Sequence, residues 1–126
     1  MKVGYVDTSC LVAIQFGEPG GRAVSRRLKA FDEIVSANLL EAELRAAFRR
    51  EGVVEPAGGH VAVSWIIPDR PLSNEIAEVL AAGYVRGADC WHLATALYLA
   101  EDPSELTFLT LDARQKEVAG TLGFGT

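Results

Sequence analysis

Apolar residues follow two different spacings along this chain, and each spacing predicts a different kind of secondary structure. Short, largely apolar runs predict β-strands at residues 2–6, 33–36 and 106–111. Apolar residues three or four positions apart predict α-helices at residues 8–16, 22–31, 38–50, 73–82, 89–100 and 112–119. Strands that alternate with helices favour a mostly parallel central sheet with helices on both faces, which is a three-layer α/β/α fold.

The stretch between residues 52 and 72 has the weakest pattern. Pro56-Ala57-Gly58-Gly59 combines residues that break regular structure, and residues 61–67 are compatible with a strand or a short helix. Residues 83–88 are expected to form a loop. No linker, low-complexity tract or internal repeat divides the chain, so we expect residues 1–126 to form a single domain.

Composition narrows the class of protein. Hydrophobic residues make up 49% of the chain and charged residues 23%, which is typical of a folded, soluble protein. No apolar run approaches the ~20 residues of a membrane span, and the first residues lack the apolar core of a signal peptide. Cys10 and Cys90 are too few for a disulfide framework. We therefore expect a cytoplasmic protein with two reduced thiols and no membrane contact.

The net charge of −5 argues against a protein that binds nucleic acid through a basic surface over its whole extent. The basic residues are unevenly placed, with one group at residues 22–29 and another at residues 45–50. Solvated helix faces are the simpler explanation of both groups. A nuclease stays compatible with the net charge, because acids that hold cations count as negative in a sequence.

Glu43 lies on the apolar side of its predicted helix. The residues that share its face are all apolar: Leu39, Leu40, Ala46 and Ala47. A buried carboxylate without a partner is strongly destabilising, and no basic residue lies within one turn on this face. A distant ion pair, protonation or a metal ion could each explain it. Glu41, by contrast, is explained as part of an N-terminal cap with Asn38.

Three aspartates lie where predicted strands end or helices begin: Asp7, Asp89 and Asp112. Each one alone is explained as a helix N-cap, a position that aspartate favours. In a parallel sheet, however, the carboxyl ends of the strands meet at one edge, where ligand sites form. Asp7 and Asp112 would both lie at that edge. Glu43 would point at the sheet from its helix, and Asp89 could reach the same place.

Four carboxylates that converge without lysine or arginine repel one another, and divalent cations relieve that repulsion. Sites made only of oxygen atoms suit Mg²⁺ or Mn²⁺. Such sites commonly serve phosphodiester hydrolysis, because metal ions lower the pKa of water and clamp the attacking and leaving oxygens. The candidate catalytic and metal-binding residues are therefore Asp7, Glu43, Asp89 and Asp112.

The four acids occur in short motifs: Val6-Asp7-Thr8-Ser9, Leu40-Glu41-Ala42-Glu43-Leu44, Ala88-Asp89-Cys90-Trp91-His92-Leu93-Ala94-Thr95-Ala96-Leu97 and Phe108-Leu109-Thr110-Leu111-Asp112. Together, and in this order, they resemble the PIN-domain nucleases, above all the VapC toxins of bacterial and archaeal toxin–antitoxin pairs. The resemblance covers nearly the whole chain. The stretch from residue 55 to residue 72 departs from it, because relatives usually place another helix there.

The resemblance implies an endoribonuclease that needs Mg²⁺ or Mn²⁺, with the four acids named above as its metal-binding quartet. It further implies an RNA substrate, products with 5′-phosphate and 3′-hydroxyl ends, an antitoxin protein that covers the site, and a homodimer. The short and Gly/Pro-broken segment at residues 55–72 bears on the shape of the substrate cleft and on the dimer contacts rather than on the acids.

Further polar residues flank the four acids. Thr8 and Ser9 could contact a phosphate oxygen or a metal-bound water, although such hydroxyls more often bond to nearby backbone. Arg86 and Arg114 are the candidates for contacts to substrate phosphate, with ordinary surface charges as the alternative. His92 would be the only nitrogen donor in an oxygen-rich site, so a packed or supporting role is expected for it.

Two other classes of protein are compatible with an α/β domain of this length. A phospho-acceptor receiver domain would need paired acids at the first strand and a lysine after the last one. Asp7 stands alone, and Lys2, Lys29 and Lys116 are all misplaced for that role. A catalytically silent PIN-like module that binds RNA or protein is the stronger alternative, and the presence of all four acids favours the enzyme over it.

Overall fold

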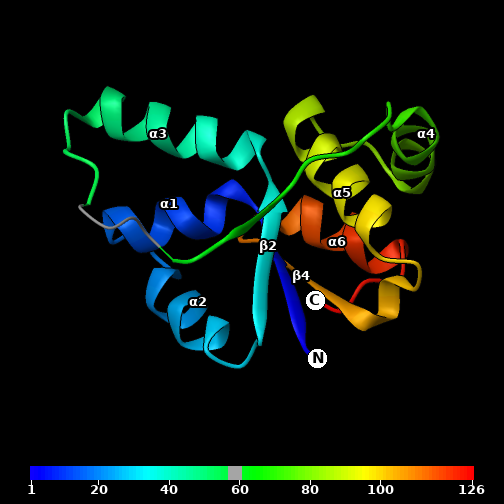
Figure 1. Ribbon diagram of the computed structural model, residues 1–126, viewed down its shortest axis with the longest axis horizontal. Helices are drawn as coiled ribbons and strands as arrows, with labels where there is room; N and C mark the ends of the chain where they lie inside the picture. Colours follow the sequence, from blue (N-terminus) through cyan, green and yellow to red (C-terminus); the bar gives the residue numbers. More distant parts are fainter. Residues whose placement is uncertain (57–60) are drawn as a thin grey trace.

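The computed structural model describes residues 1–56 and 61–126 of the chain (Figure 1). Its first part contains β1 (Val3–Val6), α1 (Thr8–Phe16), α2 (Gly21–Leu28), β2 (Glu33–Ala37) and α3 (Leu39–Glu51). Its second part contains β3 (Ser64–Ile66), α4 (Ser73–Ala82), α5 (Gly87–Leu99), a 3₁₀ turn (Pro103–Glu105), β4 (Leu106–Leu109) and α6 (Ala113–Thr121). His60 and most of the break predicted at residues 56–59 lie outside the described residues.

The described strands form one parallel sheet in the order β3-β2-β1-β4. The chain moves from β1 to one side of the sheet and later returns to place β4 on the other side. In open parallel sheets, the place where the strand order reverses leaves a crevice at the carboxyl ends of the two strands on either side of the reversal. In this fold that crevice lies beyond the ends of β1 and β4.

Helices cover both faces of the sheet, as Figure 1 shows, with α1, α2 and α3 on one side and α4, α5 and α6 on the other. Alternate residues of each strand enter two separate apolar cores. Tyr5, Val35 and Phe108 pack beneath the second group of helices. Their neighbours in the chain pack beneath the first group: Val6, Ile34 and Leu109. The predicted three-layer α/β/α fold with a parallel sheet is confirmed.

Two predictions about helix starts need correction. Asn38 occupies the predicted N-cap position of α3, but its side chain donates to Glu41 Oε1 (3.1 Å) and caps no backbone N–H. Its backbone is itself helical, which turns the side chain away from the amides of the first turn. Asp89 is not the cap of its helix either, because α5 begins two residues earlier at Gly87. Asp89 therefore lies within the first turn, where its side chain can face the crevice.

The segment after α3 forms the edge of the sheet. Of the two structures considered for residues 61–67, the strand is present, as β3. Among the described residues between α3 and α4, no helix occurs. Trp65 of β3 is 37% exposed, as expected for a short strand with one neighbour. In the described part of the chain, no helix has both the length and the apolar character that crossing a lipid bilayer requires.

Candidate active site

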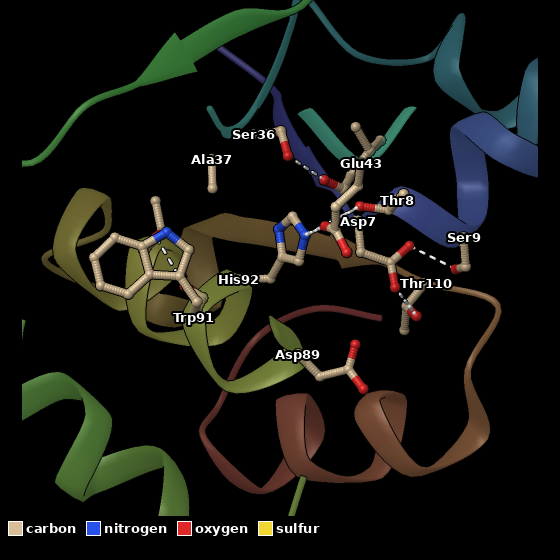
Figure 2. A network of polar contacts seen from close by, with 12 residues as sticks. Asp7, Thr8, Ser9, Ser36, Ala37, Glu43, Asp89, Trp91, His92 and Thr110 are labelled. Carbon is tan, nitrogen blue, oxygen red and sulfur yellow. Dashed lines mark hydrogen bonds and ion pairs between the residues drawn. The ribbon is translucent and has the colours of Figure 1, made fainter. Parts of the chain in front are cut away.

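Asp7 lies at the carboxyl end of β1 and is almost completely buried. As the N-cap of α1, its Oδ1 accepts the Cys10 N–H (3.2 Å) and the Ser9 hydroxyl (2.6 Å). Its Oδ2 accepts the hydroxyl of Thr110, which follows β4. The side chain thus joins the ends of β1 and β4, the neighbouring strands between which the strand order reverses (Figure 2). The N-cap explanation of Asp7 is correct, and it is compatible with a place in the site.

Glu43 reaches the same place from α3, and its side chain is one third exposed. The sequence did not identify a partner for the Glu43 carboxylate, and the structure shows two, from α1 and α5. Thr8 donates its hydroxyl to Glu43 Oε1 (2.7 Å), and the same oxygen lies 3.3 Å from His92 Nε2 of α5. The hydrogen bond with His92 lowers the pKa of Glu43, partial burial opposes this, and Thr8 lowers it further. The carboxylate is therefore held in its charged form.

His92 is fully buried behind Glu43, in agreement with the packed role expected for it. The Tyr5 hydroxyl accepts the Ala37 N–H (3.0 Å) and lies 2.8 Å from His92 Nδ1. Burial raises the pKa of the Tyr5 hydroxyl, which therefore keeps its proton and can donate a hydrogen bond to Nδ1. In that arrangement the Nε2 of the ring carries the proton that faces Glu43. A chain of hydrogen bonds therefore runs from the backbone of β2 to the carboxylate.

Asp89 lies in the first turn of α5, and its carboxylate extends toward the side of Asp7 and Thr110 (Figure 2). Burial raises the pKa of its carboxyl, and the negative charges of Asp112, Asp7 and Glu43 raise it further, against the influence of His92. The other three acids therefore act electrostatically on Asp89, although they come from three other parts of the chain. Carboxyl groups with a raised pKa that face other acids in a crevice are characteristic of functional sites.

Asp112 is exposed and caps α6, because its Oδ1 accepts the Gln115 N–H (2.8 Å). It is the acid whose contacts are best explained by local structure. It still lies at the carboxyl edge of the sheet, three residues after β4, and its charge acts on Asp89. The four predicted acids therefore surround the carboxyl ends of β1 and β4.

Two polar residues that the sequence reasoning missed hold the acids in place. The Thr110 hydroxyl donates to Asp7 Oδ2 and accepts the Asp112 N–H (3.0 Å). Gln115 is fully buried, and its amide donates to the Asp89 backbone carbonyl (3.2 Å). The spacing of Asp112 and Gln115 is that of a capping box, which could have drawn attention to Gln115.

The four flanking residues are placed differently from one another. Thr8 contacts Glu43, and Ser9 bridges Asp7 and the Leu111 N–H (3.0 Å), so both lie at the acids. Arg86 is exposed immediately before α5. The guanidinium of Arg114 is engaged within the protein, where it donates to the Tyr84 carbonyl (3.0 Å) and pairs with Glu117 (3.3 Å).

The donor set fits Mg²⁺ or Mn²⁺ by its chemistry, since it consists of carboxylate oxygens that repel one another at Asp89. Among residues 1–56 and 61–126, no three histidine, cysteine, aspartate or glutamate side chains stand close enough together to hold one ion in their present positions. A bound ion would therefore have to draw the carboxylates closer.

Comparison with known proteins places this arrangement in a family. The PIN domain family matches residues 4–121. The chain is also 32% identical to a protein named ribonuclease VapC46 from Mycobacterium tuberculosis, over 98% of this chain and 95% of that protein. No significant match was found among solved structures. Since the family match spans nearly every element described above, the chain belongs to the PIN-domain family, and its resemblance within that family is to the VapC nucleases.

Proposed function

We propose that this protein is a metal-dependent endoribonuclease and acts as the toxin of a toxin–antitoxin pair. Support for the reaction comes from the VapC-like sequence and from the position of the acids at the reversal of strand order. The observation that carries the proposal is the position of four acids from separate elements around the carboxyl ends of β1 and β4. Burial raises the pKa of Asp89, and the charges of Asp112, Asp7 and Glu43 raise it further, in agreement with that convergence. Isolated helix caps would not produce this mutual repulsion.

In this proposal Asp7, Glu43, Asp89 and Asp112 together hold Mg²⁺ or Mn²⁺. The bound ion would supply Lewis-acid chemistry, lowering the pKa of water and neutralising negative charge on the phosphate. The chain's own contribution is to hold the carboxylates in place. His92 and Thr8 do so for Glu43 through their hydrogen bonds, and Ser9 and Thr110 do so for Asp7.

The flanking residues would bind the substrate. Arg86 is the better placed of the two predicted arginines, because it is exposed and immediately precedes the helix that carries Asp89. Arg114 would first have to release the Tyr84 carbonyl and Glu117. Thr8 and Ser9 lie next to the acids and line a hollow that opens beside them. An in-line attack by water on phosphorus at this place, with the P–O3′ bond breaking and the 3′ oxygen leaving, would give 5′-phosphate and 3′-hydroxyl ends.

Family membership supports further parts of the proposal. Residues 1–126 would act as one domain in the cytoplasm, pair with a second copy of the chain, and be held inactive by an antitoxin that covers the acids. The alternative is a PIN-like module that binds RNA or protein without cleaving it. The absence of a ready-made ion cluster among the described residues is the observation that favours this alternative.

The proposal is tested by incubating the purified, partner-free protein with total cellular RNA, with and without Mn²⁺. Glu43→Gln serves as the active-site variant. Glu41→Gln is the matched control, because it removes the same charge two residues away on the same helix. We expect discrete fragments that require both Mn²⁺ and Glu43. Intact RNA with the wild-type protein, or equal cleavage by both variants, would favour the binding module.

A further inference from the structure

We propose that single-stranded RNA extends from the acidic site into a channel between α1 and α2, where Arg22 and Arg26 bind its phosphates. This inference rests on the proposed function, because it describes the path of the same substrate. It concerns the basic residues of the segment 22–29, which the four-acid site leaves unexplained. Residues of α1, the turn between the helices and α2 line this path, which we term the α2 channel.

Two adjoining hollows define the α2 channel. The first, of about 650 Å³, begins at Thr8, Ser9 and Glu43 of the acidic site. The second, of about 760 Å³, lies along α2 and is lined by Arg22 and Arg26 among others. Both hollows are lined by the same three residues of α1 and the following turn: Ala13, Glu18 and Pro19. A strand that leaves the acids over α1 therefore meets the arginines of α2.

Two glycines fix α2 beside the site. A Cβ atom at Gly21 would lie 2.4 Å from the Ala13 carbonyl oxygen, so only glycine lets α2 lie this close to α1. Gly20 has a φ of 88°, and a Cβ atom there would lie 3.1 Å from a methyl carbon of Leu111. Leu111 immediately precedes Asp112. The start of the basic helix is thus packed against the loop that carries one of the acids.

The charges of α2 separate into two sets. Arg22 and Arg26 are four residues apart, so they lie on one face of the helix, and both are exposed and line the second hollow. No ion pair to either of them is found in the described part of the chain. Arg27 is turned elsewhere and donates to the Thr126 carbonyl (3.0 Å). Two unpaired guanidinium groups in a row beside a hollow are suited to successive phosphates of an extended strand.

One residue of the α2 channel opposes this role. Glu18 lies on the part shared by the two hollows, and its side chain is exposed and negative. It would repel a phosphate that passes from the acids to α2 and so would limit the affinity. This gives the proposal a test in two directions, since removing the arginines and removing the glutamate should change RNA binding with opposite sign.

Binding is measured by fluorescence anisotropy with a short labelled oligouridine, in EDTA so that no cleavage occurs, over a series of salt concentrations. The variants are Arg22→Ala/Arg26→Ala, Glu18→Gln and Lys29→Ala. Lys29 is the matched control, because it is a basic residue at the end of the same helix that does not line the hollow. Circular dichroism confirms that each variant is folded.

We expect the double arginine variant to bind several-fold more weakly and to lose about 0.7 per arginine from the slope of log K against log salt. Glu18→Gln should bind more tightly, and Lys29→Ala should resemble the wild type. Equal losses in the arginine and lysine variants, or no binding by the wild type even at low salt, would overturn the channel. Binding that needs Arg22 and Arg26 without any metal-dependent cleavage would retain the channel and reject the nuclease. Metal-dependent cleavage together with RNA binding that does not need Arg22 and Arg26 would retain the nuclease and reject the channel.

Discussion

Glu43 owes its position in the site to side chains from three other elements. Its carboxylate accepts the Thr8 hydroxyl and faces His92 Nε2, and Tyr5 fixes the orientation of the histidine ring from the floor of the sheet. That Glu43 is a charged residue on an apolar helix face could be predicted from its neighbours in the helix. Its partners could not, because His92 lies 49 positions further along the chain and Tyr5 reads as an ordinary strand residue.

Tyr5→Phe should destabilise the protein by about 1–3 kcal/mol, because His92 Nδ1 and the Ala37 N–H both lose a buried partner. The measurement is urea unfolding at neutral pH. Tyr98→Phe is the matched control, since the Tyr98 hydroxyl donates to Asp69 at the surface (3.0 Å), and it should change stability by less than about 0.5 kcal/mol. Equal effects of the two changes would show that the buried chain of hydrogen bonds adds no stability.

Asp89 should act against the stability of the metal-free protein. Its carboxyl has a raised pKa, so the folded state resists its ionisation, and the penalty is complete at neutral pH. The penalty falls away as the pH drops through the raised folded value toward the unfolded one, near 3.8. Asp89→Asn should therefore be more stable than the wild type at pH 7, and the difference should shrink as the pH approaches that value.

Thermal unfolding over this pH range measures the difference directly. Added Mn²⁺ should stabilise the wild type and have much less effect on Asp89→Asn, because the ion removes the repulsion that the substitution has already relieved. A variant that is less stable than the wild type at neutral pH would contradict the mutual repulsion of the acids. Glu43 should behave in the opposite way, since its pKa is lowered and its contribution is lost only in acid.

At the scale of elements, α5 brings Asp89 to the acidic site, and α2 brings Arg22 and Arg26 to the α2 channel. Most helices could be predicted from apolar spacing, because each has one face in one of the two apolar cores. The residues at which the helices begin and end could not be predicted in the same way, and α5 is the clearest example. It starts at Gly87 without a side-chain cap, so nothing in the sequence marks its first turn, and that turn carries Asp89. For residues 61–67 the pattern left strand and helix open, because β3 has a single neighbour and little burial to impose alternation.

Gly21→Ala tests the close contact of α2 with α1. The new methyl group would clash with the Ala13 carbonyl, so we expect a loss of about 1–3 kcal/mol in stability. Gly120→Ala is the matched control, because Gly120 lies within α6 with open space around it and alanine is the better helix former. It should gain about 0.5–1 kcal/mol. Chemical denaturation of both variants provides the measurement, and similar stabilities would mean that α2 is loosely attached.

At the scale of the whole molecule, topology brings together acids that are spread over the chain. The order β3-β2-β1-β4 places the ends of β1 and β4 side by side, and helices from both layers direct Glu43 and Asp89 to the same crevice. The parallel sheet, and the edge at the carboxyl ends of its strands where the acids lie, could be predicted from the alternation of strands and helices. The hydrogen bonds of Thr110 and Gln115 could not, because the first depends on the pairing of β4 with β1 and the second on how α6 packs beside α5.

The central claim is that these acids form one divalent-cation site, and calorimetric titration with Mn²⁺ tests it most directly. The account predicts that the wild-type protein binds Mn²⁺ and that Glu41→Gln binds it equally well. Glu43→Gln should bind about 10-fold more weakly or worse, since it changes a proposed ligand and the loss of even an outer partner of a ligand costs that much. No binding by the wild type, or the same affinity in Glu43→Gln, would contradict the account and leave a fold whose acids serve only as helix caps and packing.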